Sequence, residues 1–234
     1  MELAKKRALE IKSNDRIAEA KKNCTASIVQ QPRLIGVTME GSDEPPDSIE
    51  ISLHFLPKSL RREFKHVFGD SYLGGGDDGC EPPPPRGHDE ESLELFAVAS
   101  NQRAKVDLVG VGDDVEAEKD RLLNVFLTFG QDVCDRICGL DADFWADYID
   151  PCSGLPMNSL SRNKVYSEVD SMEVLLGYRA YNAGFCKILC HPDWGSSVYP
   201  ATIFIYAQKQ KVIDLLGTYE TTLSDYIPDK TTSS

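Results

Sequence analysis

One long stretch of this chain constrains its fold more than any other, because its apolar residues repeat with the period of an α-helix. They recur at steps of four, three, four and four residues, at Leu122, Phe126, Phe129, Val133 and Ile137, and so share one helix face. Asp113 and Glu116 have the spacing of an N-terminal capping box, and Gly139 stands where a helix often ends. The pattern predicts a helix over roughly 114–138 whose buried face must be covered by other elements.

Short apolar or alternating segments before and after this helix predict β-strands. The expected strands cover 51–55, 93–99, 105–109, 144–149, 184–191 and 199–206. The second and third of these are predicted to form a hairpin through 100–103, and Pro57 suits the first position of a short helix. A helix near 209–216 is expected, whereas 156–178 is predicted to be loop with one helical turn. Hairpins outnumber strand–helix–strand crossovers, which predicts an α+β fold: a largely antiparallel sheet with helices packed on one side.

Glycine, proline and charge divide the chain into one domain with appendages. Residues 1–48 are predicted to form a mobile N-terminal arm, a charged helix followed by an extended tether. Residues 69–91 hold three consecutive glycines, four consecutive prolines and an acidic triplet, which predicts a disordered insertion. A tolerated surface insertion is a simpler interpretation than a polyproline ligand for a partner. We therefore expect a single domain over 49–218 and a frayed tail over 219–234.

The charge balance excludes some classes of partner. The 25 Lys and Arg residues against 38 Asp and Glu residues give a net charge of −13. Residues 1–24 hold seven bases and four acids, a net of +3, so the remainder carries −16. Nucleic-acid binding needs a basic face, so no nucleic-acid partner is expected. No window approaches the 18 or so apolar residues of a membrane helix, so no membrane partner is expected either.

Cysteine usage indicates the compartment. The seven cysteines, at 24, 80, 134, 138, 152, 186 and 190, form no even disulfide framework, and the N-terminus lacks the apolar core of a secretory signal. We expect reduced thiols in the cytoplasm. The basic N-terminus leaves a mitochondrial pool open, although its four acids are atypical of a transit peptide. Cys134 and Cys138 share one flank of the long helix, where packing is favoured over metal binding.

The segment 184–195, with the sequence G-F-C-K-I-L-C-H-P-D-W-G, carries the most chemistry. On a strand, Cys186 and Cys190 share one face, while Lys187 and His191, on the other face, could hold a neighbouring thiol as thiolate if the chain bends there. A thiolate binds soft or transition metals. A zinc site would need further ligands, and Cys152 is the only loop cysteine nearby in the sequence.

Sequence motifs predict no catalytic group. The chain contains no phosphate-binding loop, no nucleophile-elbow motif and no zinc-protease motif. His54 is expected on the solvent face of its strand and His66 on a helix surface, so neither is a predicted catalytic residue.

Two strings carry a family resemblance. The first is W-A-D-Y-I-D-P-C-S-G-L at 145–155, and the second joins G-F-C-K at 184–187 to H-P-D-W-G at 191–195. Weaker similarity extends back to P-K-S-L-R-R-E-F at 57–64, so the match covers roughly 50–206. These residues resemble the cobalamin-trafficking proteins of the methylmalonic aciduria and homocystinuria type D (CblD) family.

The resemblance implies an α+β domain akin to flavin nitroreductases that has lost flavin and activity. It implies a non-enzymatic adaptor, with no metal or cofactor of its own, that pairs with the CblC-type cobalamin-processing protein and shares its cobalamin. Such an adaptor helps direct the cofactor towards methylcobalamin, in the methionine synthase branch, and towards adenosylcobalamin. In the family, the first cysteine of a Gly-Cys-Cys-Lys element can supply a thiolate to cobalt. Phe185 stands at that position here, so Cys186, which matches the second cysteine, is the favoured candidate, with Cys190 and Cys152 as weaker ones.

Other residues of the two strings are expected to shape the partner or cofactor surface. They are Trp145, Asp147, Asp150, Pro151, Ser153, Gly154, Lys187, His191, Trp194 and Gly195. Two alternatives stay open. One is a flavin-dependent, nitroreductase-like oxidoreductase, which the few arginines of the C-terminal half disfavour. The other is a zinc-binding or redox-active thiol protein that uses Cys186 and Cys190.

Overall fold

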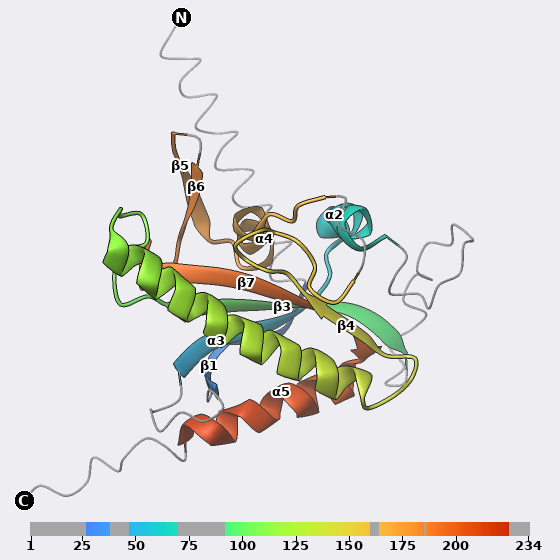
Figure 1. The fold of residues 1–234 in the computed structure, drawn as a ribbon. Helices are drawn as coiled ribbons and strands as arrows, with labels where there is room; N and C mark the ends of the chain where they lie inside the picture. The colour runs from blue at the N-terminus through green and yellow to red at the C-terminus, as the bar shows by residue number, and fades with distance from the viewer. Residues whose placement is uncertain (1–26, 38–46, 70–91, 160–163, 185, 225–234) are drawn as a thin grey trace, which may run out of the picture.

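The structure, a computed structural model, describes residues 27–37, 47–69, 92–159, 164–184 and 186–224 (Figure 1). The predictions for the charged helix at 1–24 and, apart from Gly69, for the insertion at 69–91 therefore lie outside the described residues, as does the placement of Phe185.

Five strands form one antiparallel sheet in the order β1-β2-β3-β7-β4. They are β1 (Ile28–Val37), β2 (Asp47–Phe55), β3 (Leu93–Arg103), β4 (Trp145–Tyr148) and β7 (Val198–Gln208). The central pair, β3 and β7, is hydrogen-bonded along its full length. Together with the helices, this sheet confirms the predicted α+β class.

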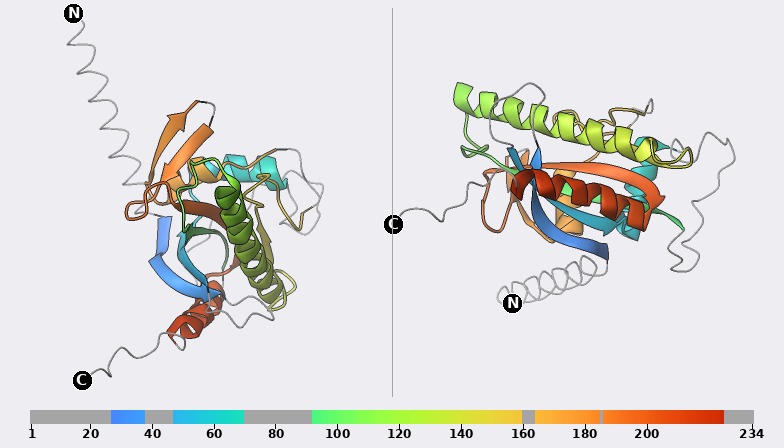
Figure 2. Two further views of the ribbon diagram at one scale, coloured as in Figure 1. Left: turned by 60° about the vertical axis from the view of Figure 1, so that its left-hand side comes forward. Right: turned by 90° about the horizontal axis from the view of Figure 1, so that it is seen from below.

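Helices cover both faces of the sheet, so the expectation of helices on one side is wrong (Figure 2). The four described helices are α2 (Lys58–Phe68), α3 (Asp113–Cys138), α4 (Glu168–Leu175) and α5 (Lys209–Ser224). Apolar residues of α3 and α5 pack on one face, and those of α2 and α4 pack on the other. The reason lies in the central strands, where consecutive residues such as Phe96, Ala97 and Val98 are all buried. An uninterrupted apolar run of this kind belongs to a strand that is covered on both sides.

The long helix confirms its predicted bounds and its buried face. All five residues of the predicted apolar stripe are at most 1% exposed. The capping box is wrong, because Gly112 is the N-cap and no side chain caps the helix. Glu116 instead pairs with Lys119, at 2.9 Å.

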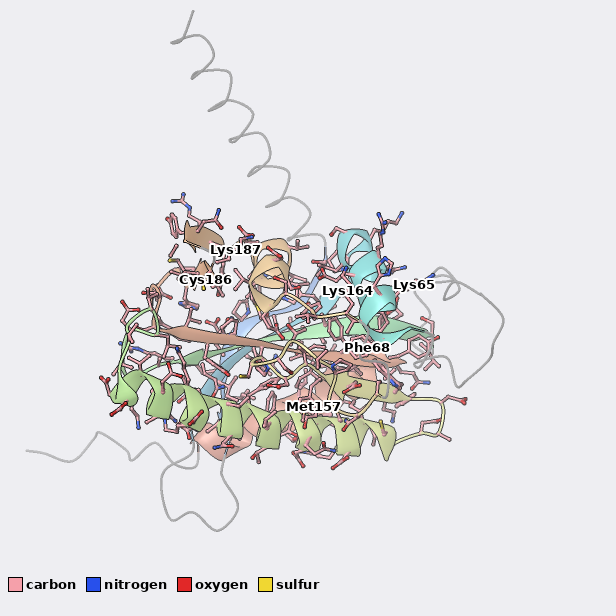
Figure 3. All side chains as sticks on the ribbon, turned by 45° about the horizontal axis from the view of Figure 1, so that its top comes forward. Lys65, Phe68, Met157, Lys164, Cys186 and Lys187 are labelled. Carbon is pink, nitrogen blue, oxygen red and sulfur yellow. The ribbon has the colours of Figure 1, made fainter. Side chains whose placement is uncertain are left out.

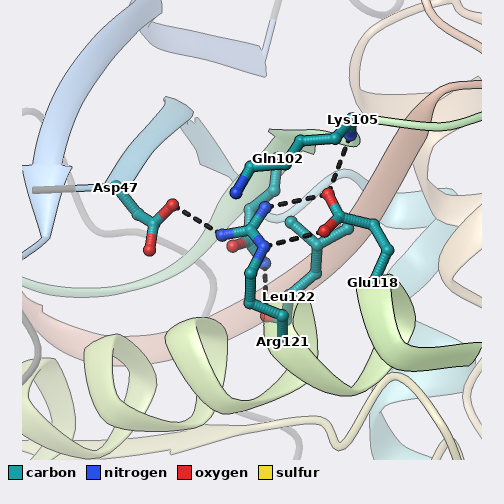
Figure 4. Close-up of polar contacts among 6 residues, drawn as sticks. All are labelled: Asp47, Gln102, Lys105, Glu118, Arg121 and Leu122. Atoms are coloured by element: carbon teal, nitrogen blue, oxygen red, sulfur yellow. Dashed lines mark hydrogen bonds and ion pairs between the residues drawn. The ribbon is translucent and has the colours of Figure 1, made fainter. Parts of the chain in front are cut away.

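A polar network ties the start of α3 to the sheet (Figure 4). Arg121 contacts Asp47, at the start of β2, at 2.6 Å, and it binds the Glu118 carboxylate at 2.8 Å. Glu118 also accepts the Lys105 backbone N–H at 2.8 Å. The Arg121 guanidinium lowers the pKa of Glu118, so the carboxylate stays charged and holds the segment that follows β3 against the helix.

The predicted hairpin with 105–109 does not form, because β2 and β7 occupy both edges of β3. Ala104 and Lys105 turn away from β3, and the Asp107 carboxylate accepts the Val109 N–H in a local turn. β3 pairs with β2 and β7 instead.

Three further boundaries differ from the predictions. Residues 28–37, assigned to the mobile arm, form the edge strand β1. Pro32 concealed this strand: proline is tolerated only at sheet edges and bulges, and it lies within a register shift between Gln30 and Arg33. The last helix runs to Ser224 rather than ending near 216, and 156–178 contains the two-turn helix α4.

Candidate functional site: the β5–β6 hairpin

A two-stranded hairpin projects beside α4, outside the central sheet (Figure 1). Its strands are β5 (Arg179–Ala183) and β6 (Cys186–Cys190), which pair with each other as a separate sheet. Gly184, at the turn, has φ of +61°, a left-handed conformation that glycine adopts without strain. The hairpin thus presents a short, regular surface at the end of a tight turn.

The two faces of the hairpin differ. Paired residues share a face, so Cys186, Ile188 and Cys190 lie with Ala183, Tyr181 and Arg179 on the outer face. On this face Cys186 is exposed, Cys190 is partly covered and Tyr181 is 55% exposed. Leu189, on the inner face, is 4% exposed and packs into the core beneath α2 and α4. The predicted sharing of one face by the two cysteines is therefore confirmed.

Lys187 docks the hairpin on α4. Its ammonium group forms ion pairs with Asp170 and Glu173, and Figure 3 shows Lys187 beside Cys186 on the hairpin. The two carboxylates raise the pKa of Lys187. Because its charge is paired with α4, Lys187 acts as a structural contact here and not as the cation that would activate a thiol.

His191 lies at the base of the hairpin, where it is 3% exposed and its side chain packs inward. Its Nδ1 accepts the backbone N–H groups of Asp193 and Trp194 at 3.1 and 3.2 Å. Its ring stacks on Trp194 with 3.8 Å between centroids. Trp194 is half-buried by this contact, whereas Gly195 is exposed, with φ of +58°. The H-P-D-W-G string therefore forms a closed turn whose inner side is the imidazole.

In the W-A-D part of the other string, Ala146 and Asp147 are buried and Trp145 is partly buried. Asp147 is fully buried. Its carboxylate accepts the backbone N–H groups of Tyr148, Asn158 and Ser159 at 2.7, 2.9 and 2.8 Å. Trp145 packs edge-on against aromatic rings of α2. Asp147 stabilises the fold, because an unpaired buried carboxylate or loop amide is costly, and Trp145 contributes an aromatic contact with α2.

The D-P-C-S-G part forms an exposed turn. Asp150 accepts the Cys152 N–H at 2.9 Å and the Ser153 hydroxyl at 2.6 Å. Gly154 has φ of +69°, and a Cβ there would lie 2.4 Å from Val165 Cγ1, so only glycine fits. Asp150 and Pro151 are half-buried, while Cys152 and Ser153 are exposed.

The two hairpin cysteines are not placed to share one metal ion. Cys186 and Cys190 are four residues apart on one strand, which separates them by about 13 Å. Among the residues that the structure describes, no three His, Cys, Asp or Glu side chains gather to hold a metal ion.

His54 contradicts its prediction, whereas His66 is exposed as expected. His54 is fully buried, and its Nε2 is hydrogen-bonded to Ser52 Oγ at 2.8 Å. Burial lowers the pKa of His54 to about 4, so the imidazole is neutral at physiological pH.

Two residues at the hairpin base were not predicted from the sequence. Glu50 of β2 and Tyr178, just before β5, share a hydrogen bond at 3.1 Å across 128 residues of chain. The alternation of β2 marked Glu50 as facing away from Ile49 and Ile51, but nothing in the sequence named its partner.

The helices in the described part of the chain are too short or too polar to span a membrane. Fold and site define an α+β protein that displays a thiol on a hairpin beside its central sheet. The profile of the methylmalonic aciduria and homocystinuria type D protein family matches residues 7–215, and the chain belongs to this family. The match begins well before residue 50 and includes β1, so the resemblance covers more of the chain than 50–206.

Curated relatives agree with this assignment. A protein from Gallus gallus is 27% identical over 165 residues, which cover 70% of this chain and 49% of the relative. A protein from Homo sapiens is 28% identical over 159 residues, which cover 68% and 47%. Both are named cobalamin trafficking protein CblD. The chain spans about half the length of these relatives.

Proposed function

We propose that this protein takes part in cobalamin trafficking as a non-enzymatic adaptor, and that the β5–β6 hairpin is its working surface. Its partner is a CblC-type cobalamin-processing protein that holds the corrinoid, and the adaptor helps direct the cofactor towards the methionine synthase and adenosylcobalamin branches. Family membership and the names of the relatives support the trafficking role.

One observation carries the choice of surface: Cys186 is exposed beside the hairpin turn. The corrin ring occupies the equatorial positions of cobalt, so a protein can add only an axial donor. A thiolate is a suitable soft donor for a transition metal. Cys190 is partly covered and further from the tip, and Cys152 lies in a different turn. Cys186 is therefore the residue proposed to approach the cobalt.

The test is an absorption titration of cob(II)alamin, bound to the CblC-type protein, with the full chain. The wild type is expected to shift the spectrum to that of a thiolate-ligated corrinoid, and Cys186→Ser is expected to abolish the shift. Cys190→Ser and Cys152→Ser are matched controls that keep it. An unchanged spectrum with the wild type, or a normal shift with Cys186→Ser, would contradict ligation by Cys186.

A parallel measurement separates adaptor function from ligation. Co-elution of the two proteins on size exclusion, with and without cobalamin, reports the complex directly. Absence of a complex would remove the adaptor proposal, whereas flavin absorbance in the purified chain would favour the oxidoreductase alternative.

A further inference from the structure

Both ends of the hairpin converge on one carboxylate of the central sheet. Tyr178, the residue before β5, donates its hydroxyl to Glu50 Oε1 at 3.1 Å. His191, the residue after β6, contacts the same oxygen through Nε2 at 3.2 Å. Asn101 of β3 donates its side-chain N–H to it at 3.3 Å. Glu50 thus joins two hairpin ends and two sheet strands at a single atom.

The contacts of His191 determine which group donates the hydrogen bond between His191 and Glu50. Because His191 Nδ1 accepts two backbone N–H groups, Nε2 is the ring nitrogen that carries a hydrogen and donates it to Glu50. Tyr178 also packs edge-on against the His191 ring, at 5.0 Å between centroids. The His191 side chain is 1% exposed and that of Glu50 15%. Hydrogen bonds to a carboxylate in such shielded surroundings are stronger than ordinary ones.

We infer that Glu50, with Tyr178 and His191, is a positioning cluster that aims the hairpin and so places Cys186. The inference rests on the function proposed above, and none of the three residues needs to touch the corrinoid.

The length of the hairpin makes its base important. Cys186 precedes His191 by five residues, or about 17 Å of strand. A rotation of about 10° at the base would therefore displace the thiol by about 3 Å at that strand length. A ligand must be held within about 0.5 Å of its productive position. The Lys187 contact with α4 is partly exposed, and exposed ion pairs contribute little, so the buried base is the stronger restraint.

The test uses the same titration of partner-bound cob(II)alamin. Glu50→Gln keeps the shape of the side chain but weakens all three hydrogen bonds. Tyr178→Phe removes one donor and keeps the ring. Glu94→Gln on β3 is the matched control, because Glu94 is partly buried on the same sheet and pairs with Ala207, away from the hairpin. Hydrogen exchange of the amides of residues 179–190 is measured in parallel.

Glu50→Gln is expected to bind the partner normally but to weaken thiolate ligation by about tenfold to a hundredfold, the usual effect of losing a residue that orients a metal ligand. Tyr178→Phe is expected to lower it less, and hairpin amides are expected to exchange faster in both variants. If Glu50→Gln does not fold, the spectral titration and hydrogen exchange of Tyr178→Phe test the positioning role instead. Faster exchange with an unchanged spectrum would overturn the positioning role and leave a purely structural one. A wild type without any spectral shift would instead remove the proposed ligation itself.

Discussion

The α3 side of the sheet and the β5–β6 hairpin are stabilised in different ways. On the α3 side, helix and strand side chains form a continuous buried apolar core. Among the described strands, those of the hairpin pair only with each other, and Leu189, the Lys187 ion pairs and the cluster at Glu50 hold the hairpin to the body. Few buried apolar contacts permit local opening without global unfolding. The comparison teaches that the core sets the stability of this protein, while a few polar contacts set the direction of its proposed working surface.

The largest expected effect lies in the core. Phe126 is fully buried between α3 and the sheet, so Phe126→Ala is expected to lower the free energy of unfolding by about 3–5 kcal/mol. The matched aromatic change in the hairpin is Tyr181→Ala, where the side chain is 55% exposed; it is expected to change stability by no more than about 0.5 kcal/mol. Urea unfolding followed by circular dichroism measures both. Similar losses in the two variants would show that the hairpin belongs to the same cooperative core.

The second expected effect concerns α4, the helix on which the hairpin packs and which itself packs on the central sheet. Glu168 of α4 is buried and accepts the backbone N–H and the hydroxyl of Thr202 in β7. Burial raises the pKa of Glu168 to about 8 from 4.5. The folded protein therefore keeps a proton that the unfolded chain loses above pH 4.5, and stability falls as the pH rises towards 8.

Glu168→Gln removes this proton equilibrium and nearly preserves the shape of the side chain. Relative to the wild type, the variant is expected to gain on the order of 2–4 kcal/mol of unfolding free energy between pH 5 and pH 8. Urea unfolding at pH 5, 6.5 and 8 provides the values. The neutral His54, whose pKa is about 4, costs stability as the pH falls below 6.5 in both proteins and cancels in the difference. A constant difference across this range would show that Glu168 titrates normally.

The sequence predicted the parts of the fold that depend on local periodicity. The α3 stripe and the pairing of faces around Cys186 and Cys190 follow from side-chain spacing alone. β1 was missed because Pro32 disrupts its pattern, and the false strand at 105–109 alternates correctly but has no free edge of β3 to pair with, because β2 and β7 flank that strand. These two outcomes depend on tertiary contacts that no local pattern contains.

The site was predicted less well, for a related reason. A motif string identifies residues with a role, but it does not tell whether a residue stabilises the fold or contacts a partner. Asp147 and His191 lie in the two strings, yet both are buried hydrogen-bond centres. Glu50 and Tyr178 lie outside them, yet both hold the hairpin. Such a long-range hydrogen bond becomes visible only when the sheet brings the residues together.

The smallest expected effect distinguishes the two regions most sharply. Lys187→Met breaks the ion pairs between the hairpin and α4, and Lys119→Met breaks the Lys119–Glu116 pair within α3. Both pairs are partly exposed, so each variant is expected to lose less than about 1 kcal/mol of global stability. The amides of residues 179–190 are nevertheless expected to exchange several times faster in Lys187→Met, because this contact restrains a hairpin that opens locally. In Lys119→Met the exchange rates of the hairpin amides are expected to be unaffected.

Hydrogen exchange followed by mass spectrometry measures these rates in both variants. Equal hairpin exchange in the two variants would mean that Lys187 contributes nothing to holding the hairpin on α4.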